Sequence, residues 1–564
     1  MKRLPIGVNN LEKIITRNYY FVDKTLLIKD VYELEGEVKL ITRPRRFGKT
    51  LNMDMIKQFY SIEGKDLFSG LKIEGEKEFI KEHYHKYPVI FVSFKDIKKI
   101  NWKEAKISIE KLLEDLAMDV FLSMKDISDK KLDVWKQEYL ERKVETHDRT
   151  LKVLTEALYK QYEKKVILLI DEYDVPIEAA YTYQHRDPDY YENMVAFMRD
   201  LLTAALKDNP YLEFAILTGV YRVAKESIFS GLNNVATYTI FENEMADKFG
   251  FTEDEVYCLL KHYNLENDID AVRDWYNGYI FGSVDGIYNP WSVIYYTKER
   301  LAGKDVEKAL QPYWINTSSN DIIIKQIENN PYLQEDLDKL LSKEELIVPI
   351  DPFLSLREVD QNPSGVWTLF ASAGYINAIQ ISRKEYSVSI PNKEIEEFYK
   401  DSVMLWLERT TKVAMYDLIR ALREAVVKGN VNRFAKLLER YLSSSLSYFD
   451  IGYDDTERVY KAFVLGMLSL GTNGYVVETE TESGYGRVDV AIHPKERRYG
   501  EYALVMELKR ANSENKLERA AKEAMIQIKE KGYSEKYEGL GYKVIPIGIA
   551  FYGKRAYVAI PENQ

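Results

Sequence analysis

The chain has 564 residues, of which 46% are apolar and 30% are charged. This length exceeds what one hydrophobic core supports, so we expect roughly two to four domains. The 79 basic and 90 acidic residues give a net charge of −11, which excludes a chain that coats nucleic acid over its whole surface. Any contact with nucleic acid must be confined to one region.

The cysteine content and the length of the apolar runs indicate the cellular compartment in which the protein is expected. Cys258 is the single cysteine, which excludes an internal disulfide and a cysteine-based metal cluster. Its apolar helical setting predicts a buried thiol, and this usage suits a reducing compartment. No apolar run approaches the length of a membrane span, and none follows the basic residues near Met1. We therefore expect a cytoplasmic protein with no membrane partner.

The first part of the chain alternates strand and helix patterns. Four segments have the apolar spacing of strands: residues 38–43, 88–94, 166–170 and 213–218. A helix is expected from Lys49, and residues 102–124 carry helical spacing. The unbroken apolar runs are typical of strands buried on both faces of a parallel sheet. The pattern predicts an α/β fold with a mostly parallel sheet over residues 1–245.

The later parts of the chain have other patterns. Residues 246–345 predict short helices and turns, and an irregular stretch near 346–400 is compatible with a small winged or mixed module. Residues 393–447 are strongly helical. The last hundred residues predict a final run of elements: helix 456–471, strands 475–482, 486–493 and 501–509, helix 514–532, and strands 543–551 and 555–560.

The segment 43–50 (Arg-Pro-Arg-Arg-Phe-Gly-Lys-Thr) follows a strand and opens a helix, which is the setting of a phosphate-binding loop. In such a loop, backbone N–H groups around Gly48 cradle phosphate oxygens. Lys49 would neutralise the charge of the β- and γ-phosphates, and the Thr50 hydroxyl would reach Mg²⁺. The sequence therefore predicts a nucleotide site at this loop.

Arginines make this loop unusual. Arg43 stands where the signature has a glycine, so the motif is one glycine short. We expect Arg45 or Arg46 to supply additional phosphate contacts in its place. The alternative is that Gly-Lys-Thr follows a strand by chance.

An apolar strand ends in two carboxylates, Asp171 and Glu172, at the edge where an open α/β sheet binds ligands. We expect Asp171 to hold Mg²⁺, directly or through water, and Glu172 to orient and deprotonate the attacking water. At the end of the next apolar strand, Thr218 is a candidate to sense the γ-phosphate and Arg222 to stabilise its charge. Ordinary strand-end polarity is the alternative for these two. The predicted cofactors are ATP and Mg²⁺.

A second acidic cluster is expected near the C-terminal end. Strand alternation puts Glu507 and Lys509 on one face, where Asp489 of the neighbouring strand can meet them. Two carboxylates can hold Mg²⁺, the metal activates water, and a lysine stabilises the phosphorane in phosphodiester hydrolysis. Glu457 is a candidate further ligand or supporting residue, and Gln527 is a candidate to orient the lysine or touch the nucleic-acid backbone. The alternative is an exposed strand edge beside a solvated helix.

The motifs of the first part of the chain are Ile6-Gly7-Val8, residues 20–25, 42–50 and 169–174, Thr218-Gly219-Val220, and residues 225–234 and 275–279. Together they resemble the prokaryotic AAA-ATPase-like proteins, which typically pair the ATPase with a C-terminal PD-(D/E)xK nuclease-like domain. The resemblance covers nearly the whole chain. Family members also carry arginine at the place of the missing glycine. The resemblance further implies that Asn289-Pro290-Trp291 lies in a lid region that packs on the adenine.

The last elements, with Asp489 on the middle strand and Gln527 on the helix, resemble the core of the PD-(D/E)xK superfamily. Val488 replaces the proline of the motif, a departure that members often show. The resemblance implies an AAA-like P-loop ATPase domain over 1–245 and a nuclease-like domain with a helical lead-in over 393–564. Between them we expect a helical lid and a winged or mixed module over 246–392.

The main hypothesis is an ATP-binding and ATP-hydrolysing protein that controls a Mg²⁺-dependent nuclease. The expected partner of the C-terminal domain is nucleic acid, with DNA preferred over RNA. The rival is a nucleotide-switched interaction protein whose nuclease-like domain only binds. A small-molecule kinase is disfavoured by the length and by the second acidic cluster. The choice between DNA and RNA stays open, as does a homo-oligomer.

Overall fold

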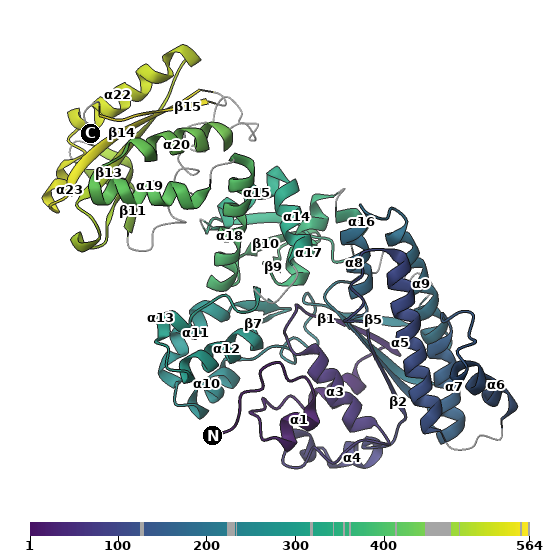
Figure 1. The fold of residues 1–564 in the computed structure, drawn as a ribbon. Coiled ribbons are helices and arrows are strands. Elements are labelled where there is room, and N and C mark those ends of the chain that lie inside the picture. Colours follow the sequence, from purple (N-terminus) through teal and green to yellow (C-terminus); the bar gives the residue numbers. More distant parts are fainter. Residues whose placement is uncertain are drawn as a thin grey trace. The chain divides into compact units, whose positions relative to one another are not determined.

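The computed structural model describes residues 1–124, 129–222, 232, 234–315, 320–341, 343–353, 356–359, 362–411, 414–445, 475–483, 486–552 and 555–561. They separate into two compact units (Figure 1). The N-terminal unit comprises Met1–Gln326 and Lys339–Glu397, and the C-terminal unit comprises Ile327–Asp338 and Phe398–Gln564. The boundaries of the expected three-part division stay predictions.

The N-terminal unit contains a five-stranded sheet in which every neighbouring pair is parallel, in the order β2-β3-β4-β1-β5. Its strands are β1 (Val38–Thr42), β2 (Val89–Ser93), β3 (Val166–Asp171), β4 (Leu212–Gly219) and β5 (Val235–Tyr238). Every residue of β1 and β3 is buried, as expected for strands covered on both faces. Because β4 lies between β1 and β3, the P-loop strand and the acidic strand are one strand apart.

Helices cover both faces of this sheet. Figure 1 shows α3 on one side and α5, α7 and α9, which pack on one another, on the other side. The elements of this part are α1 (Leu11–Thr16), α2 (Leu27–Glu33), α3 (Lys49–Tyr60), η1 (Lys72–Gly75), α4 (Lys77–His83), α5 (Trp102–Ser123), α6 (Lys130–Leu140), α7 (Thr150–Tyr162), α8 (Val175–Tyr183) and α9 (Tyr190–Leu206).

A second group of helices follows the sheet and has its own apolar core. Its elements are α10 (Glu253–His262), η2 (Glu266–Asp268), α11 (Ile269–Tyr276), β6 (Tyr279–Phe281), β7 (Val284–Ile287), α12 (Pro290–Leu301) and α13 (Val306–Ala309). Helix α10 buries Val256, Leu259 and Leu260 in this core. Cys258 points away from these positions and is exposed, so the expectation of a buried thiol was wrong. Cys258 is exposed because its position in α10 falls on the face opposite to the buried residues.

The stretch near 346–400 folds around a three-stranded antiparallel sheet in the order β8-β10-β9. In chain order, α14 (Asp321–Asn329) and α15 (Pro331–Leu341) come first, and this part continues with β8 (Leu346–Pro349), α16 (Leu356–Val359), α17 (Pro363–Ala373), β9 (Asn377–Gln380) and β10 (Glu385–Ser389). Helix α17 ends at Gly374, whose φ is +84°. A Cβ at Gly374 would lie 3.0 Å from the ring of Pro44, so the end of α17 lies directly against the P-loop.

The C-terminal unit contains a five-stranded sheet in the order β11-β12-β13-β14-β15, in which only β13 and β14 pair in parallel among the described strands. The elements of this part are α18 (Lys393–Thr411), α19 (Met415–Lys428), α20 (Asn432–Ser445), β11 (Tyr475–Ser483), β12 (Gly486–Pro494), η4 (Arg497–Tyr499), β13 (Tyr502–Arg510), η5 (Glu514–Lys516), α22 (Leu517–Glu530), α23 (Glu535–Gly539), β14 (Lys543–Tyr552) and β15 (Arg555–Ala559). Strands β11 to β15 match the expected segments, and the expected helix 456–471 lies outside the described residues.

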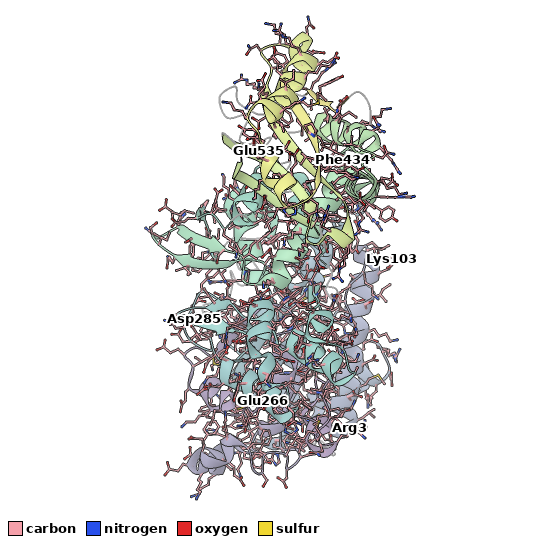
Figure 2. All side chains as sticks on the ribbon, turned by 90° about the vertical axis from the view of Figure 1, so that its left-hand side faces the viewer. Arg3, Lys103, Glu266, Asp285, Phe434 and Glu535 are labelled. Carbon is pink, nitrogen blue, oxygen red and sulfur yellow. The ribbon has the colours of Figure 1, made fainter. Side chains whose placement is uncertain are left out.

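Alternation along these strands gives the sheet two apolar faces. Leu504 and Met506 pack with α19 and α20, whereas Ala503 and Val505 pack on the side of α22 and α23. In Figure 2, the labels of Phe434 on α20 and Glu535 on α23 mark these two sides. No helix of the described residues combines the length and the apolar character needed to cross a bilayer.

Candidate nucleotide and metal sites

The P-loop holds its lysine through backbone carbonyl groups. Gly48, with a φ of +84°, is the N-cap of α3, and a residue with a side chain rarely adopts this conformation. The buried Lys49 Nζ donates to the carbonyl oxygens of Arg43 (2.8 Å) and Pro44 (2.9 Å). Burial lowers the pKa of Lys49, while the nearby carboxylates of Glu172 and Asp171 favour its charged form. The ammonium group therefore lies inside the loop and close to the acidic strand end.

Arg43, which replaces the signature glycine, belongs to the scaffold. Its side chain is fully buried and donates to the carbonyl oxygens of Tyr238 (3.0 Å) and Glu244 (3.3 Å). Its guanidinium lies over the rings of Phe249 and Phe281, each 5.4 Å away. Burial lowers the pKa of Arg43 to about 10. Arg43 thus connects the start of the P-loop to the end of β5 and the segment after it. Its side chain is used in these contacts, so the loop backbone is the part that can bind phosphate.

The other two loop arginines have different surroundings. Arg45 forms an ion pair with Glu178 of α8, so a phosphate contact by Arg45 would have to compete with that carboxylate. Arg46, with a φ of 71°, places its guanidinium 4.2 Å from the ring centroid of Trp291. Burial lowers the pKa of Arg46, and Glu172 acts in the opposite direction. Of the two arginines, Arg46 is the one held close to the acidic strand end.

Asp171 is the centre of a hydroxyl cluster. It is fully buried, and its carboxylate accepts hydrogen bonds from Thr50 Oγ1 (2.9 Å) and Thr218 Oγ1 (2.7 Å). Ser93 Oγ of β2 lies 3.4 Å from the same carboxylate. The contact with Thr50 brings together the hydroxyl and carboxylate oxygens that Mg²⁺ prefers, so these residues fit the ion. Sequence reasoning missed Ser93, although it pairs in register with Asp171.

Glu172 and Asp174 follow the strand in unusual environments. Glu172 has a φ of 54°, a strained conformation for a residue with a side chain, and such strain is common at functional sites. Asp174 is buried and accepts from the backbone N–H groups of Val220 (2.7 Å) and Tyr221 (2.9 Å). Burial raises the pKa of Asp174 to about 6. Sequence reasoning gave Asp174 no role, because its partners lie in the loop after β4.

One cavity of about 450 Å³ is lined by the P-loop residues Lys49 and Thr50 and by Glu172 and Asp174. Its walls include the P-loop from Arg45 to Asn52, the N-terminal segment around Gly7 and Phe21, and Pro290 and Trp291 at the start of α12. The next residue, Ser292, donates to the buried carboxylate of Glu394 (2.8 and 3.0 Å), which also accepts from the backbone N–H of Trp314. Burial raises the pKa of Glu394 to about 8. The start of α12 is thereby fixed beside the cavity.

Arg222 is not brought to this cavity. Its guanidinium lies 4.1 Å from the ring centroid of Phe353, and it lines a separate cavity together with Leu356 and Thr368. The chain turns away from the sheet after Gly219, the last residue of β4, and residues 223–231 lie outside the described part. In this structure the Arg222 side chain therefore lies away from the cavity where its phosphate contact was expected. The Thr218 hydroxyl contacts Asp171 at 2.7 Å, and its expected contact with the γ-phosphate stays a prediction.

The second acidic cluster lies at the carboxyl end of β13. Strands β12 and β13 pair from Val490↔Met506 to Ile492↔Leu504. Next to this ladder the Asp489 Oδ2 accepts the backbone N–H of Leu508 at 2.9 Å. Glu507 is buried at 6% exposure and Lys509 is half-buried.

Gln527 of α22 donates its amide Nε2 to Glu507 Oε1 at 2.5 Å. Glu507 pairs in register with Gly548, over which α22 passes. A Cβ at Gly548 would lie 1.9 Å from the Ala521 carbonyl oxygen, so the glycine permits the close approach that brings Gln527 to Glu507. Gln527 thus contacts the Glu507 carboxylate, and its expected action on Lys509 or on the nucleic-acid backbone stays a prediction.

Tyr533 is a further member of this cluster that sequence reasoning missed. It is 5% exposed, and burial together with the charges of Glu507 and Asp489 raises its pKa, while a hydrogen bond with Gln527 lowers it. Glu457 lies outside the described residues. Within the described part of the chain, no group of three or more His, Cys, Asp or Glu side chains could hold a metal ion. Two carboxylates still fit Mg²⁺, which commonly takes its other ligands from water and phosphate.

The fold and the two sites agree with the protein families that the chain matches. Residues 5–229 match the family described as predicted AAA-ATPase, and residues 455–559 match the PD-(D/E)XK nuclease superfamily. The chain therefore contains an AAA-ATPase-like domain followed by a PD-(D/E)XK nuclease superfamily domain. It is also similar to the "uncharacterized protein in vnfD 5'region" of Azotobacter chroococcum mcd 1, with 24% identity over 565 residues that cover 98% of this chain and 96% of that protein.

Proposed function

We propose that the protein binds and hydrolyses ATP in its N-terminal unit and that this reaction controls the cleavage of nucleic acid by its C-terminal unit. The observation that carries the proposal is the 2.9 Å contact between Thr50 Oγ1 and the buried Asp171, beside Lys49 and Glu172. A hydroxyl, a carboxylate, a lysine and a second carboxylate are the groups that phosphoryl transfer from a nucleotide to water requires.

In this proposal each group of the N-terminal unit has one task. Lys49 leaves the loop carbonyl groups and binds the β- and γ-phosphates. Thr50 and Asp171 hold Mg²⁺, which would neutralise phosphate charge when bound. Thr218 and Ser93 fix the rotamer of Asp171. Glu172 accepts the proton of the attacking water.

The nucleoside would lie toward the start of α12. Trp291 lines the cavity, and its ring is the flat apolar surface on which an adenine stacks. The guanidinium of Arg46 lies over that ring in the present structure. Binding of the base therefore requires Arg46 to leave Trp291, and the proposed phosphate contact of Arg46 gives it a new partner.

In the C-terminal unit, Asp489 and Glu507 are the proposed ligands of a divalent cation, and Lys509 the group that stabilises the developing charge on phosphorus. Gln527 positions Glu507 through its amide. The exposed side of α22 carries the internal ion pairs Arg519–Glu523 and Lys522–Glu518, so it is not the basic surface that a nucleic acid would select. The substrate is expected at the strand ends, with DNA proposed before RNA and a cytoplasmic setting.

The test uses the full-length chain with ATP, Mg²⁺ or Mn²⁺, and labelled single- and double-stranded DNA and RNA. Lys49→Ala should abolish ATP binding. Asp489→Asn and Lys509→Ala should abolish cleavage and leave ATP binding intact. Wild-type ATP affinity in Lys49→Ala would refute the nucleotide site. If the wild type cuts no nucleic acid and Mn²⁺ does not raise its thermal stability, the rival proposal of a nucleotide-switched binding module is correct.

A further inference from the structure

The loop that follows β2 begins beside the proposed magnesium site. Ser93, the last residue of β2, pairs in register with Asp171, and the backbone N–H of Phe94 donates to the Asp171 carbonyl oxygen at 3.0 Å. The chain then leaves the sheet at the same edge as Glu172, because parallel strands have their carboxyl ends together. Residues 95–98 therefore emerge next to the acidic strand end.

The strand order gives this loop a defined place relative to a bound nucleotide. The P-loop follows β1, the acidic residues follow β3, and β2 lies beyond β3. A phosphate chain that starts at the P-loop and reaches Asp171 and Glu172 points onward to the end of β2. The phosphate farthest from the nucleoside is thus the one nearest to the loop after β2.

Two lysines of this loop, Lys95 and Lys98, line the same cavity as Lys49 and Glu172. Both are exposed, and neither forms an ion pair with any residue that the structure describes. Other cations that line the cavity have partners: Lys24 pairs with Glu255, Lys248 with Asp30 and Arg45 with Glu178, and Arg46 lies over the Trp291 ring. Lys95 and Lys98 are therefore ammonium groups free to take an anionic ligand.

We propose that Lys95 and Lys98 bind the terminal phosphate of ATP and make the site discriminate between ATP and ADP. The inference rests on the proposed nucleotide site and goes beyond it by naming the residues that read the third phosphate. Asp96, between the two lysines, also lines the cavity and is exposed, so it reduces the attraction without cancelling two positive charges. Arg222, the residue expected for this task from sequence, lies against Phe353.

The experiment measures the affinity of the full-length protein for ADP and for a non-hydrolysable ATP analogue, each with Mg²⁺, by isothermal titration calorimetry. The variant is Lys95→Ala combined with Lys98→Ala. We expect affinity for the analogue to fall roughly tenfold and affinity for ADP to change less than about twofold, because each solvent-exposed ionic contact contributes modestly. Lys95→Arg with Lys98→Arg should restore discrimination.

Lys99→Ala is the matched control, since Lys99 is in the same loop but does not line the cavity. An unchanged ratio of the two affinities in the double alanine variant would overturn the proposal, and so would equal losses for both nucleotides or the same loss in Lys99→Ala. A loss of discrimination in Arg222→Ala, with the lysine variant unaffected, would return the role to Arg222. Failure of the wild type to bind either nucleotide would instead refute the nucleotide site itself.

Discussion

Gly548 controls how closely α22 approaches the sheet, and Gly548→Ala tests that arrangement. The new methyl carbon would lie 1.9 Å from the Ala521 carbonyl oxygen and 2.7 Å from the Met525 nitrogen. Ordinary contact begins at 3.4 Å, so α22 must withdraw by about 1.5 Å. The 2.5 Å hydrogen bond from Gln527 to Glu507 would then lengthen to about 4 Å and be lost.

Two assays of the full-length protein follow this change. Overpacking of this kind costs about 1–3 kcal/mol, which lowers the melting temperature of the C-terminal unit by roughly 2–12 °C. Release of the positioning contact on Glu507 should also reduce Mn²⁺ affinity or cleavage by about 10–100-fold. Thermal unfolding with and without Mn²⁺ measures the stability and the response to the metal, and cleavage of labelled nucleic acid measures the activity.

The control is Gly539→Ala at the end of α23, where a Cβ would meet nothing within 4 Å. This variant should unfold like the wild type. If Gly548→Ala also keeps the wild-type melting temperature and the wild-type response to Mn²⁺, then α22 does not hold Glu507 in the way described.

Three further predictions concern the N-terminal unit. Glu172→Gln should keep ATP affinity and slow hydrolysis by at least about 100-fold, because it removes the proposed base and leaves the metal ligands; calorimetry and phosphate release measure the two effects. Thr218→Val should raise the Mg²⁺ concentration needed for half-maximal hydrolysis by about tenfold, because the 2.7 Å hydrogen bond to Asp171 is lost, whereas Ser93→Ala, which removes a 3.4 Å contact, should have a smaller effect. Glu394 has a pKa of about 8, raised by burial from 4.5, so the folded chain binds more protons than the unfolded chain between these values. Stability should therefore fall as the pH rises through this window, on the order of 1 kcal/mol per unit, and Glu394→Gln should remove the slope in thermal unfolding from pH 5 to 9.

The local sequence pattern was sufficient to predict the strands and helices that carry the site residues. The apolar run before Asp171 predicted a buried parallel strand. Strand alternation predicted that Glu507 and Lys509 share a face, where Asp489 of the neighbouring strand can meet them. These features depend on neighbouring residues and on one strand pair. The same reasoning placed Gln527 on a helix that follows the strands, and the structure puts its amide on Glu507.

The remaining features depend on contacts between distant segments. Arg45 forms an ion pair with Glu178, which is 133 positions away in the sequence. The Arg222 guanidinium lies over the ring of Phe353, which is also distant in the sequence. Gly548 matters only because α22 crosses it, which no local pattern indicates. Short-range periodicity cannot anticipate such partners, so the sequence predicted where the sites are better than which charged side chains face a ligand.

The burial of Arg43 bears on how proteins with such a loop are found and altered. Its guanidinium donates to three backbone carbonyl groups and lies over two phenyl rings, so it fills space that a glycine would leave empty. A search that demands glycine at that position would pass over this chain although its loop has the expected strand and helix on either side. A design that restores the glycine-rich consensus there would remove a support of the loop and add nothing to its phosphate side.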